Sequence, residues 1–187
     1  MGRWEPGARI RLQAAAMELY AARGYEATTV ADIAGRAGLT ERTFFRYFPD
    51  KREVLFDGAQ QLQDLFVSTV AAHPPGRGAL NAVHAAVSAA AEVMQQGREQ
   101  ASRRAVVIAG DPVLRERELI KLATLAAALA RTLRERGVGE PAASLTAEAG
   151  VAVFRVAFER WLEGPADELF TAHIEQAFAA LRAVAAG

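Results

Sequence analysis

The chain contains no cysteine, and this absence excludes several kinds of protein. Without thiols there is no disulfide framework, no thiolate nucleophile and no cysteine-ligated metal site. The composition fits a reducing compartment. The three histidines, His73, His84 and His173, are too far apart in the sequence to form a local metal motif. The sequence therefore predicts neither a metal site nor a cofactor.

Long apolar runs and catalytic motifs are also missing. No stretch reaches the roughly 18 apolar residues that a membrane-spanning helix needs, and residues 1–7 lack the apolar core of a signal peptide. We therefore expect a soluble, cytoplasmic protein. The sequence also contains no Gly-Lys-Ser/Thr phosphate loop, nucleophile elbow or dinucleotide-binding fingerprint. These absences argue against an enzyme.

No charge sign is in excess, because 22 basic residues balance 22 acidic ones. Composition alone thus gives no sign of a nucleic-acid partner. Hydrophobic residues make up 51% of the chain, alanine is very frequent, and β-branched and aromatic residues are sparse. This composition favours helices over sheets. We predict an all-α fold, long enough for one compact unit or for a small domain joined to a larger one.

The first third of the chain has the pattern of a helix-turn-helix. A helix is predicted over residues 6–23. Thr29 and Asp32 then resemble a capping box that starts a second helix, which ends near Gly38. A third helix is predicted over residues 40–48. Two short helices joined by a tight glycine turn are typical of a DNA-binding helix-turn-helix.

Six further helices follow, which makes about nine in total. The clearest loop, residues 73–78, contains His-Pro-Pro-Gly-Arg-Gly. Apolar spacing, proline and glycine place these helices over residues 51–72, 79–96, 98–109, 112–136, 141–162 and 165–184.

The residues around the predicted turn carry a family resemblance. The segments GYEATTVADIA (24–34), AGLT (37–40) and TFFRYFPDK (43–51) resemble the DNA-binding domain of the TetR family almost position by position. The resemblance covers about the first third of the chain. It implies a homodimer of all-helical subunits, in which the last two helices form a four-helix interface and a ligand pocket lies among the helices between.

The same resemblance implies two domains and a function. We expect a helix-turn-helix DNA-binding domain over residues 1–50 and a larger helical ligand-binding and dimerisation domain over residues 51–187. The expected protein is a repressor that binds a palindromic operator in double-stranded DNA as a dimer. A small, mostly hydrophobic inducer would release it, because the second domain is apolar and rich in alanine. The alternative is a helix-turn-helix dimer that activates transcription or responds to no ligand.

The outer face of the third helix and its flanks supply the candidate DNA contacts. Residues that face their own domain are excluded by their helical phase. The candidates are Thr28, Thr29, Thr40, Glu41, Arg42, Thr43, Phe45, Arg46, Tyr47 and Lys51.

Three of these side chains suit base edges in the major groove. Arg42 can offer two parallel donors to guanine, Glu41 can accept from cytosine, and Phe45 can pack on a thymine methyl group. The alternative for Arg42 and Glu41 is that they are solvated helix charges. Many TetR-family members have a small residue at the position of Arg42 and a tyrosine at the position of Phe45.

Other candidates suit the phosphate backbone. Thr28 and Thr29 lie at the start of the second helix, where hydroxyls, amides and the helix dipole favour a phosphate; capping alone is the alternative. Tyr47 and Lys51 match family positions that contact the backbone. Arg46 is equally suited to a phosphate contact and to plain solvation.

The second domain offers candidates for a ligand pocket among residues that must mostly form core. They are Phe66, His84, Val87, Met94, Val107, Leu122, Phe154, Arg155 and Phe158. The alternative for Arg155 is an ion pair with Glu159 one turn later, and for His84 a packing role.

Apolar stripes on the last two helices predict the dimer seam. Their residues recur at i, i+4 and i+7 or i+8, a spacing that can build a four-helix interface. They are Val151, Phe154, Phe158, Trp161, Phe170, Ile174, Phe178 and Leu181.

Overall fold

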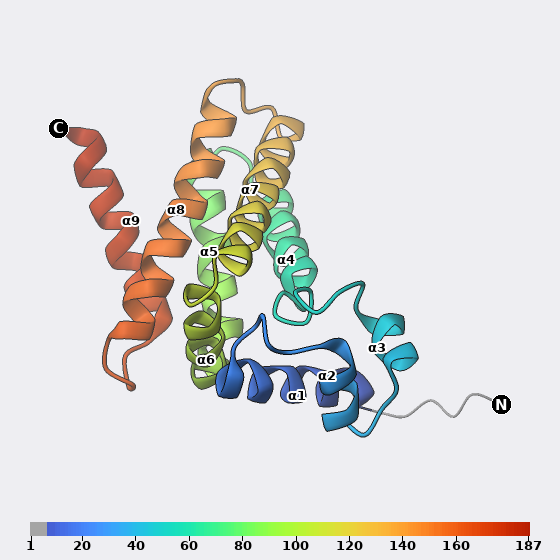
Figure 1. The fold of residues 1–187 in the computed structure, drawn as a ribbon. Helices are drawn as coiled ribbons and strands as arrows, with labels where there is room; N and C mark the ends of the chain where they lie inside the picture. The colour runs from blue at the N-terminus through green and yellow to red at the C-terminus, as the bar shows by residue number, and fades with distance from the viewer. Residues whose placement is uncertain (1–6) are drawn as a thin grey trace. The chain divides into compact units, whose positions relative to one another are not determined.

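A computed structural model describes residues 7–187, and every regular element in that range is a helix (Figure 1). The prediction of an all-α fold with about nine helices is confirmed for these residues. A short 3-10 helix, η1 (Gln95–Gly97), separates the fifth and sixth α-helices. The α-helices are α1 (Ala8–Arg23), α2 (Val30–Arg36), α3 (Glu41–Tyr47), α4 (Ala59–Ala72), α5 (Ala79–Met94), α6 (Arg98–Ala109), α7 (Pro112–Glu135), α8 (Ala142–Glu163) and α9 (Phe170–Ala186).

The helices form two compact units. One, called here the helix-turn-helix unit, comprises the chain up to Asp57 together with Glu99–Glu118. The other, called here the bundle unit, comprises Gly58–Arg98 and Leu119–Gly187. Most of α6 and the first turns of α7 therefore belong with α1, α2 and α3.

The core of the helix-turn-helix unit is built from the apolar sides of its first three helices. Leu12 on α1, Ile33 on α2 and Phe44 on α3 are fully buried. Gly38 makes the turn between α2 and α3 with a φ of 65°, in the left-handed region that favours glycine. The amide of Leu39 then donates to the carbonyl of Ala34 at 2.8 Å, which closes the end of α2.

The start of the fourth helix differs from the prediction. We expected it near Lys51, but residues 51–58 form successive turns and α4 begins at Ala59. The carboxylate of Asp50 accepts hydrogen bonds from the amides of Arg52 and Glu53, at 2.8 and 3.1 Å. This side chain satisfies amides locally, and a left-handed glycine precedes α4, so a continuous helix is interrupted.

The turn segment is held by side chains from α6 and α7 of the same unit. Arg104 donates to the carbonyl of Leu55 at 2.7 Å, and its guanidinium lies 5.0 Å from the ring centre of Phe56. Arg117 pairs with Glu53 at 2.6 Å. Burial lowers the pKa of Arg104 from its usual value. These contacts explain how a segment without regular structure keeps one conformation.

Two other predicted helix starts do not match a helix start in the structure: one differs, and the other lies outside the described residues. The last helix was expected at Pro165 but begins at Phe170, because a turn comes first, in which the amide of Glu168 donates to the carbonyl of Pro165 at 3.2 Å. The predicted start of the first helix at residue 6 lies outside the described residues. The remaining ends agree within about two residues.

An aromatic cluster forms the core of the bundle unit. Phe66 of α4 meets Phe154 of α8 edge-on, with ring centres 5.5 Å apart. Trp161 of α8 stacks on Phe170 of α9 at 4.6 Å, and Phe170 also contacts Phe158 at 5.8 Å. Such contacts add to the stabilisation from apolar burial.

Packing within the chain corrects the predicted dimer seam. Six of the eight predicted seam residues are at most 7% exposed within the single chain, so they offer little surface to a partner. The apolar spacing indicated correctly which side of each helix is covered, but the covering residues come from the same chain. The six are Val151, Phe154, Trp161, Phe170, Ile174 and Phe178, whereas Phe158 and Leu181 are half-buried.

Close helix packing adds a second constraint on the bundle unit. Gly150 of α8 is buried against α5, and a Cβ atom at this position would overlap the Cγ1 atom of Val83. Valine in a helix has essentially one side-chain rotamer, so the methyl group cannot turn away.

We therefore expect Gly150→Ala to destabilise the protein by about 1–3 kcal/mol, the usual cost of overpacking. Urea unfolding followed by circular dichroism measures the loss. The double variant Gly150→Ala, Val83→Ala should recover part of it, because the overlapping methyl group is removed. Gly35→Ala is the matched control, since a Cβ there meets nothing within 4 Å. Equal stability of the two glycine variants would contradict the close approach.

Candidate DNA-binding surface

The helix α3 is a capped helix with one buried and one exposed side. The amide of Thr43 donates to the hydroxyl of Thr40 at 3.2 Å, and the two hydroxyls lie 3.1 Å apart. This cap satisfies one of the free amides of the first turn. Phe44 points inward and is fully buried. The opposite side is exposed at Glu41, Arg42, Phe45 and Arg46, whereas Thr43 and Tyr47 are half-buried.

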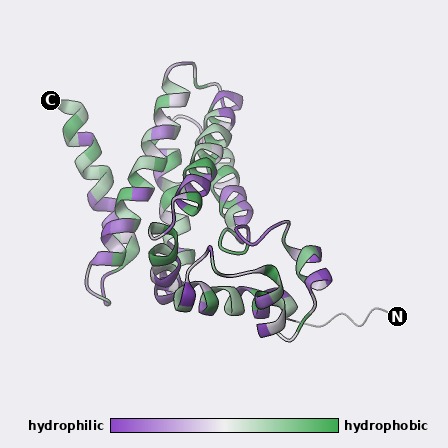
Figure 2. Cartoon of the chain, viewed as in Figure 1, coloured by the Kyte–Doolittle hydropathy of each residue, from purple (hydrophilic) through white to green (hydrophobic). Residues whose placement is uncertain are grey.

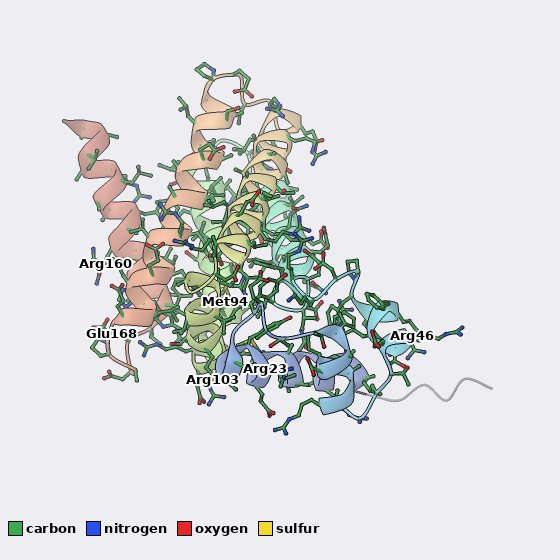
Figure 3. The ribbon with its side chains drawn as sticks, viewed as in Figure 1. Arg23, Arg46, Met94, Arg103, Arg160 and Glu168 are labelled. Atoms are coloured by element: carbon green, nitrogen blue, oxygen red, sulfur yellow. The ribbon has the colours of Figure 1, made fainter. Side chains whose placement is uncertain are left out.

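The two arginines of α3 differ in their surroundings. Arg42 makes no hydrogen bond, ion pair or ring contact with any described residue, so its five donors are available. Arg46 projects outward from α3 (Figure 3), and its guanidinium lies 5.0 Å from the ring of Tyr47 and 3.2 Å from its hydroxyl. Arg46 is thus partly engaged with its neighbour.

Phe45 is a large apolar side chain on the exposed side of α3. Its surface is 54% exposed. Its ring meets Phe44 edge-on, with centres 5.5 Å apart and planes at 84°. Phe44 in turn lies 5.6 Å from Phe48, which is also buried. The exposed ring of Phe45 therefore packs against a buried aromatic side chain.

The capping box at the start of α2 is confirmed. The hydroxyl of Thr29 accepts from the amide of Asp32 at 3.1 Å, and the carboxylate of Asp32 accepts from the amide of Thr29 at 2.9 Å. Hydrogen bonds from Thr29, followed by the nearby Arg23, hold the pKa of Asp32 below its usual value. Thr29 is exposed, so capping leaves it accessible.

The position of Thr28 contradicts its predicted role. Its side chain is fully buried, and its hydroxyl donates to the carbonyl of Gly24 at 2.8 Å. A buried hydroxyl is not presented to a phosphate in this conformation. The sequence does not distinguish the roles of Thr28 and Thr29, because the conformation of the chain just before α2 decides which of the two side chains is buried.

Lys51 is also placed differently from the prediction. Its ammonium group donates to the carbonyls of Tyr25, Thr28 and Glu26, at 2.9, 3.0 and 3.4 Å. It also lies 4.1 Å from the ring centre of Tyr25, whose pKa burial raises to about 12. The carbonyl of Lys51 accepts from the hydroxyl of Tyr20 at 2.6 Å. Three donors with three acceptors leave none for a phosphate.

Sequence reasoning missed the polar side chains of α1 that support this surface. Arg9 pairs with Asp57 and lies 5.4 Å from the ring centre of Phe48, and Gln13 donates to Asp57 at 2.6 Å. Arg11 donates to the carbonyl of Ala37, where α2 ends. These partners are more than 25 residues apart, so no local spacing could have identified them.

The predicted ligand-binding residues divide into several environments. Phe66, Phe154 and Phe158 come together in the aromatic cluster, and Val87 is fully buried. Val107 lies in the helix-turn-helix unit, unlike the other eight. Met94 and Leu122 are half-buried.

The two polar candidates in the bundle unit follow the alternatives raised from the sequence. Arg155 is exposed and pairs with Glu159 at 3.1 Å, one helical turn later. His84 packs at 4.3 Å from the ring of Phe178, and its Nε2 lies 2.7 Å from the carboxylate of Glu175. Both side chains have their polar partners within the chain.

A concave region lies between α7 and α8, and none of the predicted ligand-binding residues lines it. Its volume is about 280 Å³. Its lining is Ala123, Ala126, Ala127, Ala130, Arg134, Ser144 and Glu148. Over residues 7–187, no group of three or more His, Asp or Glu side chains is arranged to hold a metal ion. Within the same range no helix has the length and apolar character needed to cross a membrane.

Comparison with known sequences identifies both parts of the chain. Residues 12–57 match the bacterial regulatory proteins of the tetR family, and residues 77–186 match the MftR C-terminal domain, a match that covers more than half of the chain. The regulator TcmR of Streptomyces glaucescens is 37% identical over 81 residues. That alignment spans 43% of this chain but only 36% of TcmR.

Solved structures share the fold over nearly the whole chain. Thermus thermophilus FadR, a transcriptional repressor in complex with lauroyl-CoA, is 25% identical, with 92% of each chain covered and a TM-score of 0.54. Bacillus subtilis FadR, in complex with stearoyl-CoA, has a TM-score of 0.65 at 17% identity, covering 92% of this chain and 96% of its own. The second likeness concerns the fold alone.

The environment of Lys51 makes a prediction opposite to that of a phosphate contact. We expect Lys51→Met to lower the free energy of unfolding by about 1.5–3 kcal/mol, the range for hydrogen bonds to a charged group, and to leave the salt dependence of DNA binding unchanged. Urea unfolding and affinity titrations at several salt concentrations measure the two quantities.

Arg46→Met is the matched control for Lys51→Met. Its outward charge suits a phosphate, so its loss should lower the salt slope by about one unit with little change in stability. If Lys51→Met instead lowered the slope and left stability intact, the ammonium group would contact a phosphate.

Proposed function

Since the chain belongs to the TetR family of bacterial regulatory proteins and is a transcriptional regulator, we propose that it is a repressor released by a small molecule. It binds a palindromic operator as a homodimer, and α3 enters the major groove. A mostly hydrophobic inducer then lowers its affinity for the operator. The single observation that carries the DNA-binding part is the exposed side of α3, where Arg42 has no partner among residues 7–187.

The DNA-binding surface comprises fewer residues than the sequence prediction. Arg42 and Phe45 face base edges, with Glu41 beside them, and Thr29, Thr40, Thr43, Arg46 and Tyr47 lie toward phosphates. Thr28 and Lys51 are left out, because their polar groups are used inside the unit. A guanidinium without a partner has no bonds to break before it binds a base, which favours Arg42 as the specific contact.

The proposed dimer uses the outer sides of α8 and α9 in place of the buried stripes. On α8, Leu145, Ala149, Ala152 and Val156 recur at spacings of four, three and four, and Leu145 is 65% exposed. On α9, most of the exposed positions carry small apolar residues, and Figure 2 shows the C-terminal part of this helix mostly in green, the colour of hydrophobic residues. They are Ala172, Ala179, Ala180, Ala183, Val184, Ala185 and Ala186. Small residues at heptad-like spacing allow two helices to approach closely.

The proposed inducer is apolar because few of the predicted ligand-binding residues are polar. His84 and Arg155, the polar candidates, already have partners, and most other candidates are aliphatic or aromatic. Lauroyl-CoA, the ligand of Thermus thermophilus FadR, combines a long apolar chain with a polar carrier and is a suitable first compound to test.

One observation favours a second candidate function, a regulator that responds to no ligand. Phe66, Val87 and Phe154 are packed by neighbouring side chains and are at most 6% exposed. A ligand at these residues would have to displace well-packed side chains, which costs stability. A constitutive DNA-binding dimer avoids this cost.

The test of DNA binding starts from a pool of randomised duplexes, from which the chain selects its operator. We expect a palindromic site. Arg42→Ala should lose about 1–3 kcal/mol of binding free energy and relax base preference at one position in each half-site. Arg155→Ala removes a charge from the bundle unit and should bind like the wild type. If Arg42→Ala lost affinity equally for all sequences, Arg42 would be a phosphate contact.

Titration of the protein–operator complex separates the two candidate functions. Lauroyl-CoA is added, with free coenzyme A as the control. Release requires a difference in ligand affinity between the two dimer conformations, and about 3 kcal/mol changes operator occupancy roughly a hundredfold. An operator affinity that no apolar compound in a tested series alters supports the constitutive regulator. A reporter gene placed behind the operator distinguishes repression from activation.

The dimer prediction concerns the exposed stripe of α8. We expect the wild type to sediment as a dimer at micromolar concentration, and Ala152→Arg to sediment as a folded monomer, because a buried unpaired charge is costly at an interface. Thr124→Arg, on an exposed position of α7, is the matched control and should remain dimeric. Dimers in all three proteins would place the interface elsewhere, and a monomeric wild type would contradict the dimer.

A further inference from the structure

We propose that Phe45 reads the 5-methyl group of a pyrimidine in the major groove, so that thymine is preferred at one position in each operator half-site. The inference rests on the proposed DNA binding through α3. It names the chemical group that this surface recognises beyond the guanine contact of Arg42.

Exposure alone does not carry this inference, because single exposed apolar residues are common on protein surfaces. The position of Phe45 is more informative than its 54% exposure. The ring lies on the same side of a short helix as Arg42, three residues earlier, and has Arg46 as its neighbour in the chain. Among the described residues, its one aromatic contact is with Phe44.

The support of the ring argues for a contact role. Phe44, edge-on to Phe45, is fully buried, and it packs on the buried Phe48. The guanidinium of Arg9 lies against the ring of Phe48 at 5.4 Å from its centre. Phe45 is thus supported by two buried aromatic side chains in succession. A rigid aromatic side chain loses little conformational entropy when it binds.

The chemistry of the Phe45 side chain determines which group of a base it can contact. Phenylalanine has no hydroxyl, so it neither donates to a phosphate nor accepts from a base. The apolar group that base edges present in the major groove is the thymine methyl group. 5-Methylcytosine carries the same methyl group at the same ring position, so this contact does not distinguish it from thymine.

The spacing from Arg42 limits where the methyl group lies. Side chains three positions apart on a helix have Cβ atoms about 5–6 Å apart, and successive base pairs are about 3.4 Å apart along one strand. The guanine read by Arg42 and the pyrimidine read by Phe45 therefore lie within two base pairs of each other.

The experiment replaces single methyl groups in the selected operator. Each thymine is exchanged in turn for deoxyuridine, which keeps every hydrogen-bonding group and removes only the methyl group. We expect one position in each half-site at which this exchange weakens wild-type binding about fourfold, the effect of one buried methyl group. At that position Phe45→Ala should bind the thymine and deoxyuridine duplexes equally.

A second exchange tests the chemical group itself. With a C·G pair at the sensitive position, methylation of the cytosine should strengthen wild-type binding about fourfold and leave Phe45→Ala unchanged. Arg42→Ala is the matched control and should retain the preference for thymine over deoxyuridine while losing its preference for guanine. Thermal unfolding checks that both exposed-residue variants remain folded.

The outcomes distinguish this inference from the proposed function. The role of Phe45 is overturned if the wild type binds the operator but no thymine-to-deoxyuridine exchange weakens binding, or if Phe45→Ala is weakened by the same exchange. Either result leaves the DNA-binding function standing. Selection of no duplex at all overturns both.

Discussion

The ammonium group of Lys51 and the three loop carbonyls around it form the contact on which the helix-turn-helix unit depends. The loop before α2 and the turns after α3 have no regular hydrogen bonding to each other, and this side chain joins them. The hydroxyl of Tyr20 secures the same residue through its backbone carbonyl. Because these turns directly follow α3, the ammonium group of Lys51 links the C-terminal end of α3 to the loop before α2.

Cations in this unit fall into two groups with different roles. Arg9, Arg11 and Lys51 bind carboxylates or carbonyls of the unit itself, and they keep the ends of α2 and α3 in place. Arg42 and Arg46 remain on the outer side of α3. A net charge of zero over the whole chain conceals this division. The directions in which the charged side chains point, rather than their number, make the outer side of α3 suitable for DNA.

Local signals allowed much of the architecture to be predicted. Apolar residues at helical spacing, glycines at turns and the Thr29–Asp32 capping box depend on residues a few positions apart, so they can be predicted without knowledge of tertiary contacts. The exposed arginines and Phe45 of α3 were identified for the same reason, because helical phase separates the side chain of Phe44 from its neighbours.

The sequence by itself therefore determined the all-α class, the helix-turn-helix and the family, whereas the tertiary structure decided how individual side chains are used. A helical stripe indicates that a face is covered but not by which partner, so Trp161 and Ile174 were assigned to a dimer and are buried in their own chain. Similarly, Lys51 matches a phosphate-contacting position by sequence. In the folded chain, however, its ammonium group binds carbonyls about 25 residues away in the sequence. Both decisions depend on contacts between distant residues, which spacing along the chain does not encode.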